Sequence, residues 1–232
     1  MDVDLAFLVR SLAEQAVPEQ GSGRLRLPPE RELVATFEIS RGALREQLSM
    51  LEMLGFVDRT QGRGSYLRVP DAGFLQLYFD LSRQLEQLSQ DQFSSAREML
   101  EICVAEAAAA RATSDDVDEL RGLVDEMVRA ADAGEDHRAF EADLEFHRRL
   151  FVVVDNPIFN LVREGLAHVL RSEVVGRRQL AAEHEAIPPG AMRPSDAVHY
   201  EIVEALAAQD GEAARDAMRR HFRVWRSATG NP

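Results

Sequence analysis

The stretch that decides the fold runs from residue 40 to residue 69 and reads SRGALREQLSMLEMLGFVDRTQGRGSYLRV. Leucines recur every three or four residues in its first half, which predicts an amphipathic helix that Ser40 caps. Two strand-like runs follow at residues 56–60 and 65–69, and the glycine-flanked tip at 61–64 separates them. A helix followed by such a β-hairpin is typical of a winged helix-turn-helix.

Two further helices are predicted upstream of this stretch. Residues 4–17 have helical apolar periodicity and end before a loop at 18–23 that contains proline, glycine and serine. The second helix begins at Pro28 and Pro29, because proline is tolerated in a first helical turn. Three helices and a hairpin therefore predict a winged helix-turn-helix domain over residues 1–69.

Downstream of Asp71 the pattern is helical almost to the end, with loop signals that separate a linker helix from about six further helices. We expect the linker helix at 70–90 and an all-helical bundle at 91–228. A chain of 232 residues accommodates two such domains. The predicted fold class is mostly α, with an N-terminal winged helix-turn-helix and a helical C-terminal bundle.

Composition excludes several classes of protein. With 45% hydrophobic and 29% charged residues, the chain can bury cores and is unlike a disordered one. We expect neither a signal peptide nor a membrane span, because the N-terminus carries Asp2 and Asp4 and no apolar run is long enough. The one cysteine, Cys103, lies in an alanine-rich helical stretch, so a buried thiol and a cytoplasmic protein are expected.

The net charge of −13 argues against a globally basic nucleic-acid binder, but the charge is unevenly distributed. From Arg24 to Arg68 there are eight arginines and six acids, so this segment is +2 and the remainder is −15. On the helix that follows Ser40, Arg41 and Arg45 lie one turn apart and could bind guanine edges or phosphate. Alternatively, they are solvated charges paired to Glu46 or Glu52.

The hairpin tip offers a second set of candidate DNA contacts. Gly62 and Gly64 would let the backbone approach the duplex, and Arg63 between them could reach the minor groove or a phosphate. Ser40 and Gly42, at the start of the preceding helix, are also predicted to contact DNA.

In the C-terminal part, polar residues interrupt apolar helical stripes. Asp143 and His147 lie four residues apart on one such stripe, and His199 and His221 lie on two others. An aspartate and three histidines that converge would form a site for a divalent metal. For each histidine the alternative is a satisfied hydrogen bond in the core. The remaining histidines are expected to be structural or solvated, and they are His137, His168 and His184.

The N-terminal motifs resemble those of the GntR family of bacterial regulators over about residues 5–69. The motifs are Leu27-Pro28-Pro29-Glu30-Arg31-Glu32-Leu33, Ser40-Arg41, Leu44-Arg45-Glu46, Leu54-Gly55-Phe56-Val57 and Gly62-Arg63-Gly64. The resemblance implies DNA contacts from Arg31, Arg41 and Arg45. The chain departs from the family at Glu38, where a glycine is usual, and at Gly42-Ala43, where Thr-Pro is common.

The C-terminal part resembles the FCD sensing domain of the FadR subfamily over about residues 91–228. The matching segments are Arg97–Thr113, Asp143 with His147, His199 with Ile202, and Gly211–His221. The resemblance implies that Asp143, His147, His199 and His221 bind zinc or nickel, which helps to hold a carboxylate effector. Arg97 matches an arginine that faces the pocket, and Arg171 is a weaker candidate. Alternatively, Arg97 is a surface charge beside Glu98 and Glu101.

These features predict a one-component transcription regulator and not an enzyme. We expect a homodimeric repressor that binds double-stranded operator DNA and responds to a small organic acid. One alternative is a regulator that binds acyl-CoA without a metal, and full occupancy of the metal-ligand positions argues against it. The other is a metal-dependent hydrolase, which the absence of His-Asp, Glu-x-x-His and His-Glu-x-x-His motifs disfavours.

Overall fold

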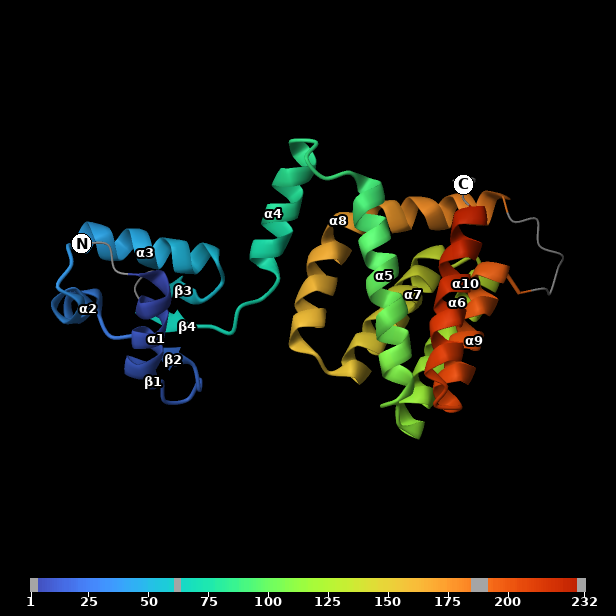
Figure 1. Ribbon diagram of the computed structural model, residues 1–232, viewed down its shortest axis with the longest axis horizontal. Helices are drawn as coiled ribbons and strands as arrows, with labels where there is room; N and C mark the ends of the chain where they lie inside the picture. Colours follow the sequence, from blue (N-terminus) through green and yellow to red (C-terminus); the bar gives the residue numbers. More distant parts are fainter. Residues whose placement is uncertain (1–3, 61–63, 185–191, 229–232) are drawn as a thin grey trace. The chain divides into compact units, whose positions relative to one another are not determined.

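The computed structural model describes residues 4–60, 64–184 and 192–228, and Figure 1 traces its helices and strands in chain order. Two of the predicted DNA contacts, Gly62 and Arg63, lie outside these ranges. The chain divides into two compact units, Met1–Tyr78 and Phe79–Pro232. Each unit is described by itself.

The N-terminal unit is a winged helix-turn-helix, as the sequence predicts. Its helices are α1 (Leu5–Gln15), α2 (Glu30–Phe37) and α3 (Arg41–Met53). Its strands are β1 (Val17–Pro18), β2 (Leu25–Arg26), β3 (Val57–Thr60) and β4 (Gly64–Leu67), in one antiparallel sheet of order β1-β2-β4-β3. The predicted hairpin is β3 and β4. The strands β1 and β2 are not predicted, because two exposed residues each give no alternating pattern.

Leucines from all three helices form the core of this unit. Those with no exposed surface are Leu8, Leu12, Leu44, Leu48 and Leu51. Ser40 caps α3 as expected, because its Oγ accepts a hydrogen bond from the Ala43 amide at 3.1 Å. The N-cap of α2 is Pro29, so that helix begins at Glu30 and not at the prolines themselves.

The turn between α2 and α3 contains an unusual backbone conformation. Glu38 ends α2 with φ 53° and ψ 35°, in the left-handed region. Side chains with a Cβ are strained there, and glycine is not. This conformation explains why the family usually has a glycine at this position. In this chain a glutamate adopts the conformation, at an energetic cost.

Seven helices follow the wing in the described part of the chain, which agrees with the expected linker helix and about six more. They are α4 (Gly73–Gln84), α5 (Gln90–Ala109), α6 (Ser114–Asp132), α7 (Asp136–Val154), α8 (Pro157–His184), α9 (Pro194–Ala207) and α10 (Gly211–Ala228). The boundary between the two units falls within α4. Among the helices described, none has the length and apolar character that a membrane span requires.

The C-terminal unit is a helical bundle in which α10 packs on α5 and α9, and α6 packs on α7 and α9. Small side chains let these helices approach closely, since Ala105 and Ala108 of α5 and Ala214 of α10 are fully buried. Larger side chains such as Phe146 and Ile202 fill the spaces between them. The N-termini of α5 and α6 are fixed by capping boxes at Ser89 and Thr113.

A second, smaller cluster joins the end of α4 to the bundle. Phe93 of α5 packs with Leu166 and Leu170 of α8, and Phe79 of α4 packs against them. The rings of Phe79 and Phe93 meet edge to face with centroids 5.3 Å apart. The linker helix is therefore held by the same residues that position α8.

Two expectations for single residues in this unit are wrong. Cys103 is exposed, because α5 buries the face that carries Glu101, Val104 and Ala105, and Cys103 lies on the other side. The alanine-rich composition predicts the helix but not which face is buried. The residues around His184 predict a loop at 182–186, but the backbone of α8 continues to His184.

We expect Glu38→Gly to stabilise the N-terminal unit by about 1 kcal/mol, because glycine adopts the left-handed conformation without strain. The control is Glu32→Gly, which lies within α2 and should destabilise by about 1 kcal/mol, because glycine is a poor helix former. Native-state hydrogen exchange of the α2 and α3 amides measures both changes. A loss of stability in Glu38→Gly would contradict the assignment of strain to this turn.

Candidate functional site

Three helices bring four polar side chains together in the core of the C-terminal unit. Asp143 and His147 come from α7, His199 from α9 and His221 from α10, and each is at most 4% exposed. One ligand atom from each of the three histidines lies within 4.8 Å of the others. Asp143 Oδ1 lies 3.2 Å from His199 Nε2 and 3.9 Å from His147 Nε2. The structure thus brings all four predicted metal ligands to one place.

Polar groups lie behind two of the histidine rings. Glu101 of α5 lies on the other side of His147, with its Oε2 2.6 Å from Nδ1. His199 Nδ1 is 3.2 Å from the carbonyl oxygen of Asp196, and a proton on Nδ1 can be donated to it. With a proton on each Nδ1, the Nε2 atoms of His147 and His199 would be free to bind a metal beside Asp143.

Glu101 also belongs to the candidate site, although its sequence context does not predict it. It is 4% exposed and also forms an ion pair with Arg97, whose Nε lies 2.6 Å from Oε1. Burial by itself would raise the pKa of Glu101, but Arg97 and His147 outweigh it and lower that pKa to about 2. Glu101 is therefore a buried carboxylate that links Arg97 to the histidine cluster.

The surroundings of His221 favour its neutral form. Burial, together with the proximity of His199 and His147, holds the pKa of His221 well below its ordinary value of 6.5. Its ring packs 6.3 Å from that of Trp225, centroid to centroid, and Trp225 is the single tryptophan of the chain. A neutral imidazole has a free lone pair, so His221 is in the form that binds metals.

Four buried nitrogens of the cluster call for a further partner. Among the described residues, no hydrogen-bond partner meets Nδ1 or Nε2 of His147, Nε2 of His199 or Nδ1 of His221. A buried polar atom without a partner is costly in a protein core. Imidazole nitrogens and a carboxylate oxygen are ligands that suit divalent zinc and nickel. The donor set therefore fits the expected metal, and any metal here would be held by Asp143, His147, His199 and His221.

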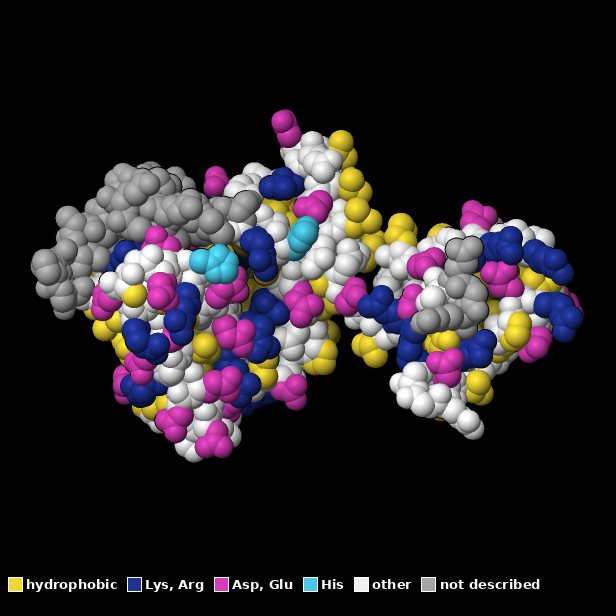
Figure 2. Space-filling model, turned by 180° about the vertical axis from the view of Figure 1, so that it is seen from behind, with side chains coloured by type: hydrophobic (Ala, Val, Ile, Leu, Met, Phe, Trp, Pro, Cys, Tyr) yellow, Lys and Arg dark blue, Asp and Glu magenta, His cyan; other side chains and the backbone are white. Residues whose placement is uncertain are grey.

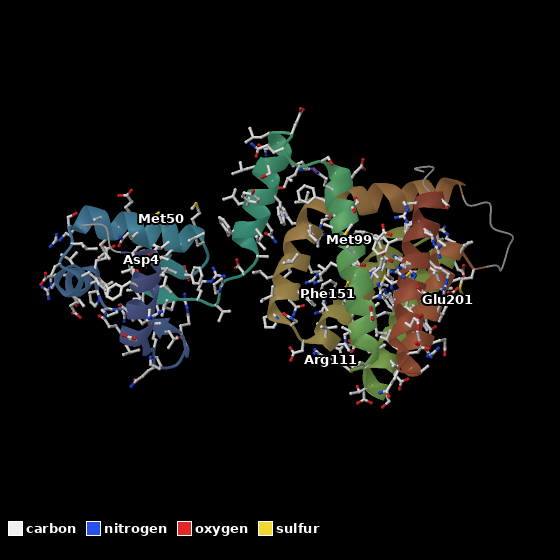
Figure 3. The ribbon with its side chains drawn as sticks, in the orientation of Figure 1. Asp4, Met50, Met99, Arg111, Phe151 and Glu201 are labelled. Atoms are coloured by element: carbon white, nitrogen blue, oxygen red, sulfur yellow. The ribbon has the colours of Figure 1, made fainter. Side chains whose placement is uncertain are left out.

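A small cavity of about 40 Å³ adjoins this cluster. Both predicted effector-binding residues, Arg97 and Arg171, line it together with His147 and Phe151. Figure 3 labels Phe151, which projects into the bundle between α5 and α8. The side chain of Arg97 is only 17% exposed, so the alternative of a surface charge is wrong, although Glu101 is its partner.

The predicted DNA-binding residues of the N-terminal unit lie exposed at the start of α3 and on α2. They are Arg31, Ser40, Arg41, Gly42 and Arg45. In the wing, Gly64 has φ 111°, a conformation that favours glycine, and a Cβ there would meet Arg26 Nε at 3.3 Å. Figure 2 shows basic side chains at several places on the visible face of this unit.

Arg45 has a partner that the sequence analysis did not foresee. Its Nε donates to Glu30 Oε2 at 2.9 Å, whereas the alternative to DNA contact paired it with Glu46 or Glu52. Glu30 also pairs with Arg59 of β3 at 3.1 Å, and the hydrogen bond from Arg45 is the main cause of its lowered pKa. The side chain of Arg45 remains 66% exposed, so Glu30 orients it without covering it.

Residues 92–224 match the FCD domain family, and residues 24–67 match the family of bacterial regulatory proteins called gntR. The chain belongs to the GntR family. It is 29% identical over 228 residues to YcbG of Bacillus subtilis (strain 168), an uncharacterized HTH-type transcriptional regulator, with 97% of this chain and 91% of YcbG covered. It is 26% identical over 217 residues to the galactonate operon transcriptional repressor of Escherichia coli (strain K12), with 90% of each covered.

A solved structure of the GntR family supports the same assignment. Streptococcus agalactiae GntR superposes with a TM-score of 0.64 at 25% identity, and the match covers 96% of this chain and 97% of that one. The GntR match spans the α2, α3 and wing segments, and the FCD match spans the histidine cluster. This GntR-family chain is a DNA-binding transcription regulator with an FCD domain and not an enzyme.

The low pKa of Glu101 predicts a pH-dependent stability in the chelator-treated, metal-free protein. A carboxyl whose pKa falls from 4.5 to about 2 on folding stabilises the fold above pH 4.5 and loses that contribution as the pH falls toward 2. The contribution is up to about 3 kcal/mol, and Glu101→Gln should remove it. Urea unfolding followed by circular dichroism measures the difference between the two proteins. A difference that stays constant from about pH 6 to pH 3 would refute the assignment.

Proposed function

We propose that this chain is a homodimeric repressor of the FadR subfamily whose operator affinity is set by a small carboxylate effector at a metal site in the C-terminal unit. The observation that carries the proposal is the convergence of Asp143 with three buried histidines beside a cavity lined by arginines. A purely structural polar cluster would not require the adjoining cavity with Arg97 and Arg171 in its wall.

The metal would be divalent zinc or nickel, and when bound it would offer one or two open coordination positions to an effector oxygen. Residues of the chain would make the other contacts with the effector. Arg97 lies in the cavity wall and can donate to a carboxylate, while Glu101 limits how far Arg97 can turn. The E. coli relative named for the galactonate operon supports a small organic acid, such as a sugar or hydroxy acid, as the effector.

We further propose a route from the cavity to the linker helix. Leu166 and Leu170 line the cavity and also belong to the cluster that holds Phe79 of α4. In addition, His168 Nε2 lies 2.9 Å from Asp80 Oδ2 and ties α8 to α4 directly. A ligand that shifts α8 would therefore shift α4, and a coupling of about 1–3 kcal/mol would regulate DNA binding clearly.

On the DNA side we propose that two copies read a pseudo-palindromic operator in the cytoplasm. One recognition helix covers too few base pairs for specificity, and two-fold proteins bind two-fold sites. The proposed contacts are Arg31, Ser40, Arg41, Gly42, Arg45 and the wing residues Gly62, Arg63 and Gly64. Among the described residues no carboxylate forms an ion pair with Arg31 or Arg41, so both remain available for phosphate or bases.

The alternative of a metal-free acyl-CoA sensor has less support. A long acyl chain needs a large apolar cavity, whereas four arginines line this one. The buried nitrogens of His147 and His221 would also remain without partners. A small polar ligand next to a metal satisfies both features.

We expect Arg45→Ala to weaken specific operator binding by about 1–3 kcal/mol with the fold intact. The matched control is Arg10→Ala, which removes the same charge from an exposed position on α1. Gel-shift titrations at fixed salt on a duplex selected from a randomised pool compare the two. Operator affinity that is unchanged in Arg45→Ala would exclude this residue as a DNA contact.

We expect His147→Ala combined with His221→Ala to lose the metal and, with it, the response to effector. The control is His137→Ala, because that side chain is 89% exposed. Metal analysis, calorimetry with the acid that co-purifies, and operator binding are measured on all variants. The mechanism is wrong if the double variant keeps stoichiometric metal, or if it loses metal and still responds normally.

A further inference from the structure

The cavity carries more positive charge than one carboxylate would balance. Arg97, Arg148, Arg163 and Arg171 line it, and Glu101 is the one carboxylate among its described lining residues. That carboxylate is already engaged by Arg97 and His147. The other three guanidinium groups have no acidic partner within the described cavity wall.

Arg163 is the most buried of these three cations. Its side chain is 19% exposed, and its one ion pair in the described structure is with Glu164, at 3.2 Å, a carboxylate that is itself 47% exposed. Its Nε is buried without a hydrogen-bond partner among the described residues. Burial lowers the pKa of Arg163, and the proximity of Arg148 lowers it further. A buried guanidinium N–H without an acceptor is costly, and an anion would remove that cost.

The surroundings of Arg163 would strengthen its interaction with an anion. Its guanidinium lies 5.8 Å from the ring centroid of Phe151, and Leu166 and Leu170 form an apolar wall beside it. In such surroundings charge-assisted hydrogen bonds are stronger than in water. Arg148, which comes from α7, is 42% exposed and paired with Glu145, so it can turn toward a ligand without leaving a buried group unpaired.

We propose that the effector is a small dicarboxylic acid, with one carboxylate beside His147 and Arg97 and the second bound by Arg163 with help from Arg148. The inference rests on the proposed function, because the first carboxylate is the one assigned to the metal site. The cavity of about 40 Å³ is smaller than such an acid. Binding therefore requires the arginine side chains to move outward, as side chains commonly do at binding sites.

The test is calorimetry on the metal-loaded full-length chain with chain-length-matched acids. The dicarboxylates are malonate, succinate, glutarate and adipate, and the monocarboxylates are propanoate, butanoate, pentanoate and hexanoate. At least one dicarboxylate should bind about tenfold more tightly, or more, than its matched monocarboxylate. Arg163→Gln should abolish that preference and leave monocarboxylate binding unchanged, and Arg163→Lys should retain part of it.

The control is Arg215→Gln, because Arg215 pairs with Glu106 on α5 and does not line the cavity. It should keep the dicarboxylate preference of the native chain. Equal binding of matched acids, or a preference that survives Arg163→Gln, overturns this inference and leaves the proposed metal-bound carboxylate standing. If neither kind of acid binds the metal-loaded chain, both the inference and the proposed function fail.

Discussion

The structure of the C-terminal unit depends on one constraint, the burial of a carboxylate among three imidazoles. Removing Asp143 from water costs several kcal/mol unless polar groups surround it. Because His147 is one turn further along α7, the remaining partners must come from other helices, namely His199 of α9 and His221 of α10. The positions of these helices are thus set by a polar centre as well as by the leucine, alanine and phenylalanine core around it.

The polar centre, the cavity and the linker helix share residues, so the proposed effector site lies directly against the packing of the linker helix. His147 belongs to the first two, and Leu166 and Leu170 belong to the last two. In the proposed mechanism, a shift of α8 would change the packing around Phe79 directly. In the N-terminal unit, one residue likewise serves two partners, because the carboxylate of Glu30 pairs with both Arg45 and Arg59.

The fold class could be predicted from the sequence, and so could the place of Asp143 and His147, because helical periodicity puts residues four apart on one face. The place of Glu101 in the site could not be predicted, because its spacing from Arg97 is equally typical of an ion pair on a helix surface. Its burial depends on which face of α5 turns toward α7, and the same uncertainty made the expectation for Cys103 wrong. The partner of Arg45 was also missed, because Glu30 lies 15 residues away along the chain.

The position of Trp225 gives the native chain its own optical probe. It is the single tryptophan, it is 8% exposed, and its ring lies 6.3 Å from that of His221. Indole emission therefore originates beside the histidine cluster and from nowhere else in the molecule. A paramagnetic ion such as nickel in this cluster would quench that emission and zinc would not, so the unlabelled protein can distinguish the two metals in a single spectrum.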